Sequence, residues 1–189
     1  KELVDPDSFI NSANFTLQEN IGKKIILIDF WTYSCINCQR TLPYLKAWHN
    51  KYADKGLLIV GVHTPEFEFE KKYENVLQAV KKFGVEYPVV QDNEYKTWRA
   101  YNNRYWPRKY LIDIDGFIVY DHIGEGGYEE TELKIQELLQ ERMDAFGMKN
   151  EWDKNISVVE AEMVRFGLIE TPEIYFGYQR GGSFIGNSE

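Results

Sequence analysis

The chain has 189 residues, 43% of them hydrophobic, which is enough for one domain with a sizeable core. Its formal net charge is -8 and its lysines are dispersed along the chain, which argues against binding to nucleic acid. The longest strongly apolar run covers only residues 25–28, far short of the roughly 20 residues that cross a bilayer, so no transmembrane segment is expected.

The first half of the chain predicts two units of strand followed by helix. Residues 9–24 are polar with scattered apolar positions, and they predict a short hairpin or arm. A buried strand is expected over 25–30, and apolar residues at three-residue spacing then predict a helix that ends at Gly56. A second buried strand over 57–62 leads through a loop into a helix that ends at Gly84.

The second half predicts a hairpin with a helix on either side. The expected elements are a short strand over 87–90, a short helix over 94–101, antiparallel strands over 108–113 and 117–121, and a closing helix up to Gly147. The order of elements implies an α/β sandwich with a mixed sheet of about five strands, and residues 1–149 are expected to form it.

Residues 150–189 differ in composition from the rest of the chain. A short helix is expected over 158–166, followed by a stretch rich in glycine and aromatic residues. We interpret 150–189 as a linker that runs into a truncated segment. The alternative is a tail that packs on the domain or stays partly mobile.

Cys35 and Cys38 are the only cysteines, and this sparse use excludes a disulfide framework. The pair is therefore redox-active, half of a metal site, or incidental. At a junction between strand and helix, the unpaired amides and the helix dipole favour a thiolate at Cys35. One helical turn further on, Cys38 is expected to be less exposed and to attack the mixed disulfide formed on Cys35. The spacing thus predicts that Cys35 attacks and Cys38 resolves.

The segment ILIDFWTYSCINCQRTLP resembles the thioredoxin superfamily in its strand, aromatic pair, C-x-x-C motif and helix proline. The resemblance implies a thioredoxin-like three-layer α/β/α sandwich with an N-terminal extension and thiol-disulfide oxidoreductase activity. By position, Asp29 matches the buried acid of that family, Trp31 the active-site tryptophan, and Pro43 the proline that kinks the active-site helix.

The chemistry of Asp29 and Trp31 leaves alternatives open. Burial raises the pKa of a carboxyl group among Ile and Leu, which suits Asp29 to act as acid and base for Cys38. The alternative is an inward-facing Asp29 satisfied by a nearby lysine or water. Trp31 is expected to contact the substrate beside the cysteines, and the alternative for it is packing in the core.

Two further segments match expected site positions. Trp106-Pro107, just before the hairpin, resembles the family's cis-proline, whose bend lets the neighbouring backbone pair with an extended substrate. Glu66 lies in the loop after the second strand, where related maturation proteins carry an acid near the site. The alternative is that Glu66 is a solvated glutamate among Glu68 and Glu70.

Within the superfamily, the segments GKKIILIDFW, VGVHTPEF and YLIDIDGFIVYDHIGEGG resemble the extracytoplasmic TlpA, ResA and cytochrome c maturation group, and most of all the redox domain of DipZ-like proteins. This resemblance implies protein disulfides as substrates, no cofactor beyond the redox-active disulfide, and electrons supplied by a CcdA-type membrane protein. It also implies an extracytoplasmic reductant. The chain starts at Lys1 without a signal peptide, so we expect a longer or membrane-tethered parent.

In DipZ-like proteins a carbohydrate-binding-like β module follows the redox domain, and TPEIYFGYQR resembles its start, which would make 150–189 a linker or the truncated start of that module. One departure concerns the residues between the cysteines, which are Ile36 and Asn37 rather than the Gly-Pro of thioredoxin. This dipeptide influences redox poise, so the reduction potential of thioredoxin does not carry over.

Two rival functions use the same residues. A Sco-like copper chaperone would bind metal through the cysteines and one of His49, His63 or His122, but Sco-type cysteines are spaced C-x-x-x-C. A thiol peroxidase would explain the TPEF segment, but such enzymes place an activating group before a single peroxidatic cysteine. The vicinal pair favours the oxidoreductase, with no bound metal.

Overall fold

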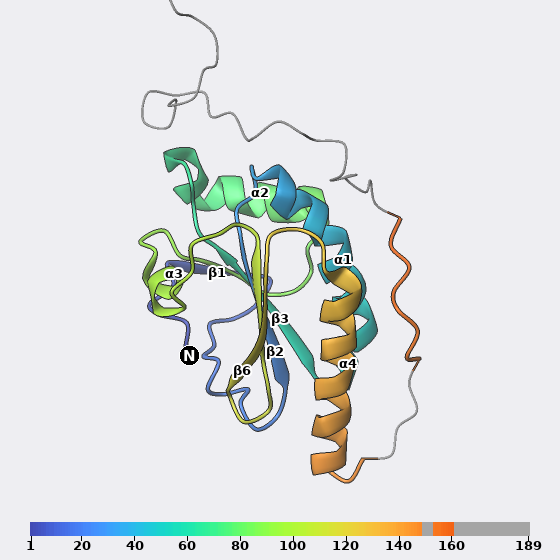
Figure 1. The fold of residues 1–189 in the computed structure, drawn as a ribbon. Helices are drawn as coiled ribbons and strands as arrows, with labels where there is room; N and C mark the ends of the chain where they lie inside the picture. Colours follow the sequence, from blue (N-terminus) through green and yellow to red (C-terminus); the bar gives the residue numbers. More distant parts are fainter. Residues whose placement is uncertain (149–152, 161–189) are drawn as a thin grey trace, which may run out of the picture.

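A mixed six-stranded sheet forms the centre of the computed structural model, which describes residues 1–148 and 153–160 (Figure 1). The strands lie in the order β1-β4-β3-β2-β5-β6. β3 runs parallel to β2 and to β4, whereas β1, β5 and β6 pair antiparallel with their neighbours. Their bounds are β1 Ser8–Ile10, β2 Ile25–Trp31, β3 Leu57–His63, β4 Val89–Gln91, β5 Arg108–Ile112 and β6 Ile118–Ile123.

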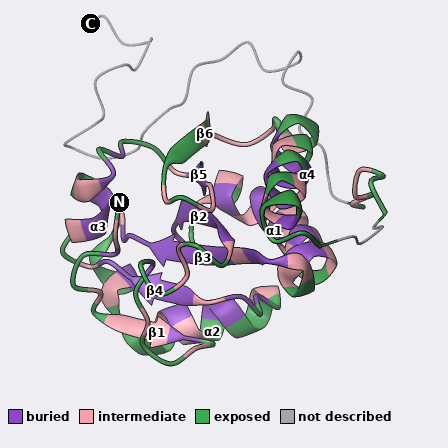
Figure 2. Ribbon diagram, turned by 90° about the horizontal axis from the view of Figure 1, so that it is seen from below, coloured by how far each residue is buried: buried purple, intermediate pink, exposed green. Residues whose placement is uncertain are grey.

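Helices cover both faces of this sheet. They are α1 Ile36–Tyr52, α2 Tyr73–Phe83, α3 Lys96–Ala100 and α4 Tyr128–Ala145, with 3-10 turns at η1 Ala53–Lys55 and η2 Glu68–Lys71. Alternate residues of β2 face opposite sides, so Leu27 joins a core with α1, α2 and α4, while Ile28 joins a core with α3 and the N-terminal segment. Figure 2 shows the buried residues gathered on the strands and the inner sides of the helices. The chain therefore has the expected three layers.

Most expected elements are confirmed, but the N-terminal segment and the number of strands differ from the expectation. Residues 9–24 form no hairpin; instead β1 pairs with β4, and Ser8 lies opposite Gln91, 83 positions further along the chain. This pairing adds a sixth strand to the expected five. Local sequence patterns carry no signal for such a distant partner, because the pairing depends on where the chain returns. The helix expected over 158–166 falls mostly outside the described residues.

The segment that follows α4 is tied back to the domain through a buried carboxylate. Glu132 of α4 is 1% exposed and accepts hydrogen bonds from Trp48 Nε1 at 3.0 Å and Tyr52 Oη at 2.7 Å. It also accepts the Ser157 amide at 2.9 Å and the Ser157 hydroxyl at 2.7 Å. Residues 153–160 therefore lie against α1 and α4.

Candidate active site

The two cysteines lie where β2 ends and α1 begins. Cys35 is the N-cap of α1, in an extended backbone conformation, and its sulfur accepts the backbone N–H of Cys38 at 3.4 Å. Both thiols are free, and Cys35 is half-buried whereas Cys38 is only 1% exposed. The junction therefore offers one sulfur to a partner and keeps the other beneath it.

The surroundings of the two sulfurs push their acidities in opposite directions. A hydrogen bond with the Cys38 side chain lowers the pKa of Cys35, and the amides at the start of α1 act in the same direction. Burial and the negative charge of Glu66 oppose this lowering without reversing it. Burial raises the pKa of Cys38 well above its ordinary value, and the proximity of Cys35 raises it further. The geometry thus suits Cys35 for the thiolate and Cys38 for the protonated form.

Beneath the cysteines, Asp29 faces a lysine that sequence reasoning did not identify. Lys109 of β5 lies directly opposite Asp29 of β2, and both side chains are buried on the same face of the sheet. Lys109 Nζ donates to the Gly124 carbonyl at 3.2 Å, while Asp29 Oδ1 has no hydrogen-bond partner among the described residues. The sequence left open a nearby lysine as a partner of Asp29 but did not identify it. The signal in the sequence was the position of Lys109 inside the strand expected over 108–113.

Burial raises the pKa of Asp29 to about 7, although the positive charge of Lys109 pulls it down. Burial lowers the pKa of Lys109, and the charge of Asp29 opposes that shift. Asp29 also acts on Cys38, since its charge is one of the causes that raise the pKa of that thiol. A carboxyl group with a pKa near neutrality can both accept and return a proton at physiological pH.

The expected cis-proline is present beside the site. The Trp106-Pro107 peptide bond is cis, and it immediately precedes β5, whose first residue Arg108 pairs with Phe30 near the end of β2. Trp106 is half-buried, and its Nε1 donates to the carbonyl of Thr64 at 3.0 Å. Trp106 and Pro107 therefore lie at the same end of the sheet as the cysteines.

Trp31 does not have the substrate-facing position expected for it. Its side chain has no exposed surface, and its ring packs edge-on against His63 at 5.4 Å between centroids. The indole fits because Gly61 on β3 carries no side chain; a Cβ there would lie 2.9 Å from Trp31 Nε1. The packing alternative is the one that the structure supports.

The acidic loop after β3 contains residues in very different environments. Glu66 is half-buried, and its charge opposes the lowering of the Cys35 pKa, as an acid near the site would. The side chain of Glu68 is 87% exposed, as a solvated glutamate would be. Glu70, by contrast, is fully buried. Alternation of acidic and aromatic residues in EFEFE gave no signal for which acid turns inward.

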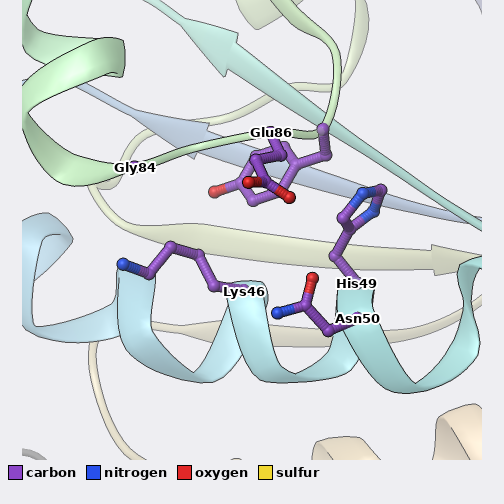
Figure 3. Close-up of a pocket in the computed structure, with 6 residues that line it drawn as sticks. Lys46, His49, Asn50, Gly84 and Glu86 are labelled. Carbon is purple, nitrogen blue, oxygen red and sulfur yellow. The ribbon is translucent and has the colours of Figure 1, made fainter.

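Two pockets flank α1. One of about 530 Å³ is lined by Tyr33, Ser34 and side chains of α1 and α2, beside the segment that leads into Cys35. The other, of about 130 Å³, is shown in Figure 3, where Lys46, His49 and Asn50 extend from α1 towards Gly84 and Glu86.

These positions bear on the rival functions. His49 follows Cys38 by eleven residues on one helix, about 16 Å along its axis, so these two side chains cannot share a metal ion. Among the described residues, no group of three His, Cys, Asp or Glu side chains is placed to hold a metal. The Thr64 hydroxyl of the TPEF segment donates to Asp92 at 3.2 Å, next to the start of α3. Thr64 follows Cys35 in the chain and is hydrogen-bonded to Asp92, so it does not supply the activating group that a peroxidase places before its cysteine.

Comparison with known proteins agrees with this geometry. Residues 6–139 match the Redoxin family. The chain is 30% identical over 136 residues to the thiol-disulfide oxidoreductase ResA of Bacillus cereus, covering 67% of this chain and 76% of ResA. The solution structure of a thioredoxin-like protein in its oxidised form superposes with a TM-score of 0.65 at 27% identity, covering 71% of this chain and 90% of that one. The chain therefore belongs to the Redoxin family and has the thioredoxin-like fold.

Within this class, the chain is similar to the protein DipZ of Mycobacterium tuberculosis. The two are 42% identical over 172 residues, which is 88% of this chain and 24% of DipZ. The chain thus spans about a quarter of the length of the DipZ relatives that it matches.

Replacing Lys109 tests its role in setting the protonation of Asp29. Lys109→Met removes the cation that lowers the pKa of Asp29, so we expect that pKa to rise from about 7 by about one unit or more. The carboxyl carbon shift of Asp29, followed by NMR across pH, measures it. Arg108→Met is the matched control, because Arg108 is the neighbouring cation of β5 and pairs with Asp121 instead. An unchanged midpoint in Lys109→Met would contradict the assignment.

Proposed function

We propose that this chain reduces disulfide bonds of extracytoplasmic proteins through a Cys35–Cys38 dithiol/disulfide couple, in which Cys35 attacks and Cys38 resolves. The observation that carries the proposal is the asymmetry of the two sulfurs. Cys35 is accessible, and hydrogen bonds from the Cys38 side chain and from amides at the start of α1 lower its pKa, whereas Cys38 is buried and its pKa is raised. Only Cys35 combines access with thiolate character.

The reaction proceeds in two exchange steps. In the first, the Cys35 thiolate attacks one sulfur of the substrate disulfide; that S–S bond breaks, a mixed disulfide forms, and the other substrate sulfur leaves as a thiolate. In the second, Cys38 gives its proton to the Asp29 carboxylate and its thiolate attacks the Cys35 sulfur. The substrate leaves with both sulfurs reduced. The Cys35–Cys38 disulfide that remains takes up two electrons and two protons from an electron donor before the next cycle.

The direction of electron flow is argued from charge and from similarity. The pKa of Cys35 is lowered overall, which stabilises the reduced form, whereas the negative charge of Glu66 acts in the opposite direction and makes the couple more reducing than it would be without that charge. In the DipZ-like arrangement that the motifs resemble, a CcdA-type membrane protein supplies electrons, and 42% identity to DipZ supports the same donor here. Resemblance to the TlpA and ResA group supports the extracytoplasmic location and a membrane-tethered parent. Within residues 1–148 and 153–160, no helix combines the length and hydropathy of a membrane span.

The assigned roles of the cysteines predict which variant accumulates a mixed disulfide. Cys38→Ser is expected to trap a disulfide-bonded substrate on Cys35, because the resolving thiol is gone, while Cys35→Ser is expected to trap none. Non-reducing electrophoresis of the two variants with a disulfide-containing peptide, followed by mass mapping of the adduct, measures this. Equal trapping by both variants would refute the division of roles.

The proton transfer to Asp29 predicts a selective effect on the second step. With Asp29→Asn, mixed-disulfide formation is expected to keep its rate while resolution by Cys38 slows by about 100-fold, the lower range for loss of a general base. Rapid-quench single turnovers separate the two rates. A variant that slows both steps equally would show that Asp29 acts through structure and not as the base for Cys38.

The reduction potential decides the direction. We expect the couple to lie nearer to thioredoxin, about -270 mV, than to the oxidant DsbA, about -120 mV. Equilibration with a series of glutathione or dithiothreitol ratios, read out by alkylation and mass, gives the value. A potential near that of DsbA would make the chain an oxidant, and the proposed supply of electrons by a CcdA-type protein would fall with it.

A further inference from the structure

Glu70 is a buried acid at the active site that the reaction steps leave unused. It belongs to the 3-10 turn Glu68–Lys71 between β3 and α2, and it has no exposed surface. A carboxylate in such a place is costly unless each oxygen is hydrogen-bonded. Both oxygens of Glu70 are, and the identity of the donors connects this residue to the thiol.

The two carboxylate oxygens of Glu70 accept hydrogen bonds from two different segments beside Cys35. Oε1 accepts the Ser34 hydroxyl at 2.5 Å, with the Ser34 amide further away at 3.4 Å. Oε2 accepts the backbone amides of Glu66 at 2.6 Å and Phe67 at 2.9 Å. Ser34 immediately precedes the attacking cysteine, and Glu66 carries the charge that acts on it. One carboxylate therefore joins the two segments whose separation matters for Cys35.

Tyr33, which precedes Ser34, makes further contacts with β3 and with the loop that follows it. The Tyr33 ring stacks on His63 at 5.6 Å, and the Tyr33 hydroxyl donates to the Phe69 carbonyl at 3.4 Å. The Tyr33 amide donates to His63 Nε2 at 3.3 Å. Both Tyr33 hydrogen bonds are longer than three of the hydrogen bonds to Glu70, which come from the Ser34 hydroxyl and the amides of Glu66 and Phe67. The charged carboxylate therefore makes the shorter connection between the segments.

We propose that Glu70 is a positioning residue for the reaction of Cys35: by tying the backbone of Glu66 and Phe67 to Ser34, its carboxylate holds the Glu66 side chain where it acts on the thiol. Coulomb interaction depends on distance, so a fixed loop gives a fixed effect, and a loose loop lets solvent screen it. The inference rests on the proposed role of Cys35 as the attacking thiol.

The charge state of Glu70 fits this role. Burial acts to raise the pKa of Glu70, but the hydrogen bonds from the side chains of Ser34 and Thr32 and from the amides of the loop outweigh it and leave the pKa lowered. The carboxylate is therefore ionised at neutral pH, when all its donors are engaged.

A double-mutant cycle on the full chain tests the proposal. Glu66→Gln and Glu70→Gln are made singly and together, and the alkylation of Cys35 by iodoacetamide is followed across pH by peptide mass mapping. In the native background, Glu66→Gln removes a negative charge and is expected to speed alkylation near pH 6 by about two- to fivefold, the size of a partly exposed charge interaction. In the Glu70→Gln background, the same change is expected to have an effect below about 1.5-fold.

Two outcomes would overturn the proposal. An additive cycle, with Glu66→Gln equally effective in both backgrounds, would show that Glu70 does not position Glu66. If Glu66→Gln had no effect in the native background, the Glu66 charge would not act on Cys35, and Glu70 could not hold it in place for that purpose. A chain that still traps substrate on Cys35 but gives an additive cycle loses this inference alone, while the assigned role of Cys35 stands.

Matched variants separate positioning from a general loss of structure. Glu68→Gln removes an equal charge from an exposed position of the same turn, and it is expected to leave the response to Glu66→Gln unchanged. Ser34→Ala removes the donor at the other end of the connection and is expected to weaken that response as Glu70→Gln does. Circular dichroism and thermal unfolding check the fold of each variant. If Glu70→Gln does not fold, Ser34→Ala carries the test.

Discussion

The central strand β2 has no exposed residue along its length, and its burial sets the environment of Asp29 and of the two cysteines that follow it. Flanked by β3 and β5 and covered on both faces, it places the last residues before the site in a medium of low polarity. A carboxyl group on such a strand has its pKa raised unless a cation is near. Asp29 has both influences at once, because the register of β5 puts Lys109 opposite it. The result is an acid whose proton affinity suits exchange near neutral pH.

The same strand decides how the sulfurs differ. Because β2 ends just before α1 begins, Cys35 caps the helix and its sulfur accepts a backbone N–H, while Cys38 turns into the core. Two residues of one type, a single helical turn apart, thus differ in both access and acidity. This difference follows from the hydrogen bond between the two cysteines, from the amides at the helix N-terminus and from the burial of Cys38.

Loops from two further strands complete the surroundings of Cys35. The loop after β3 brings Glu66 and Glu70, and the loop before β5 brings Trp106 and the cis-proline. A hydrogen bond from Trp106 to the Thr64 carbonyl joins these loops to each other, as Glu70 joins the first of them to Ser34. Loops joined by hydrogen bonds therefore surround the Cys35 thiol, and side chains that do not themselves react hold them together.

By itself, the sequence determined the strands and helices that carry the site, the redox pair, the burial of Asp29 and the position of Pro107, since these follow from local periodicity and from motif spacing. Only the tertiary structure decided that Lys109 faces Asp29, that Trp31 lies inside the core, and that Glu70 turns inward while Glu68 does not. It also decided that β1 joins β4. Each of these depends on strand register or loop packing between residues distant in the chain, and no local pattern encodes which distant group will fill a given space.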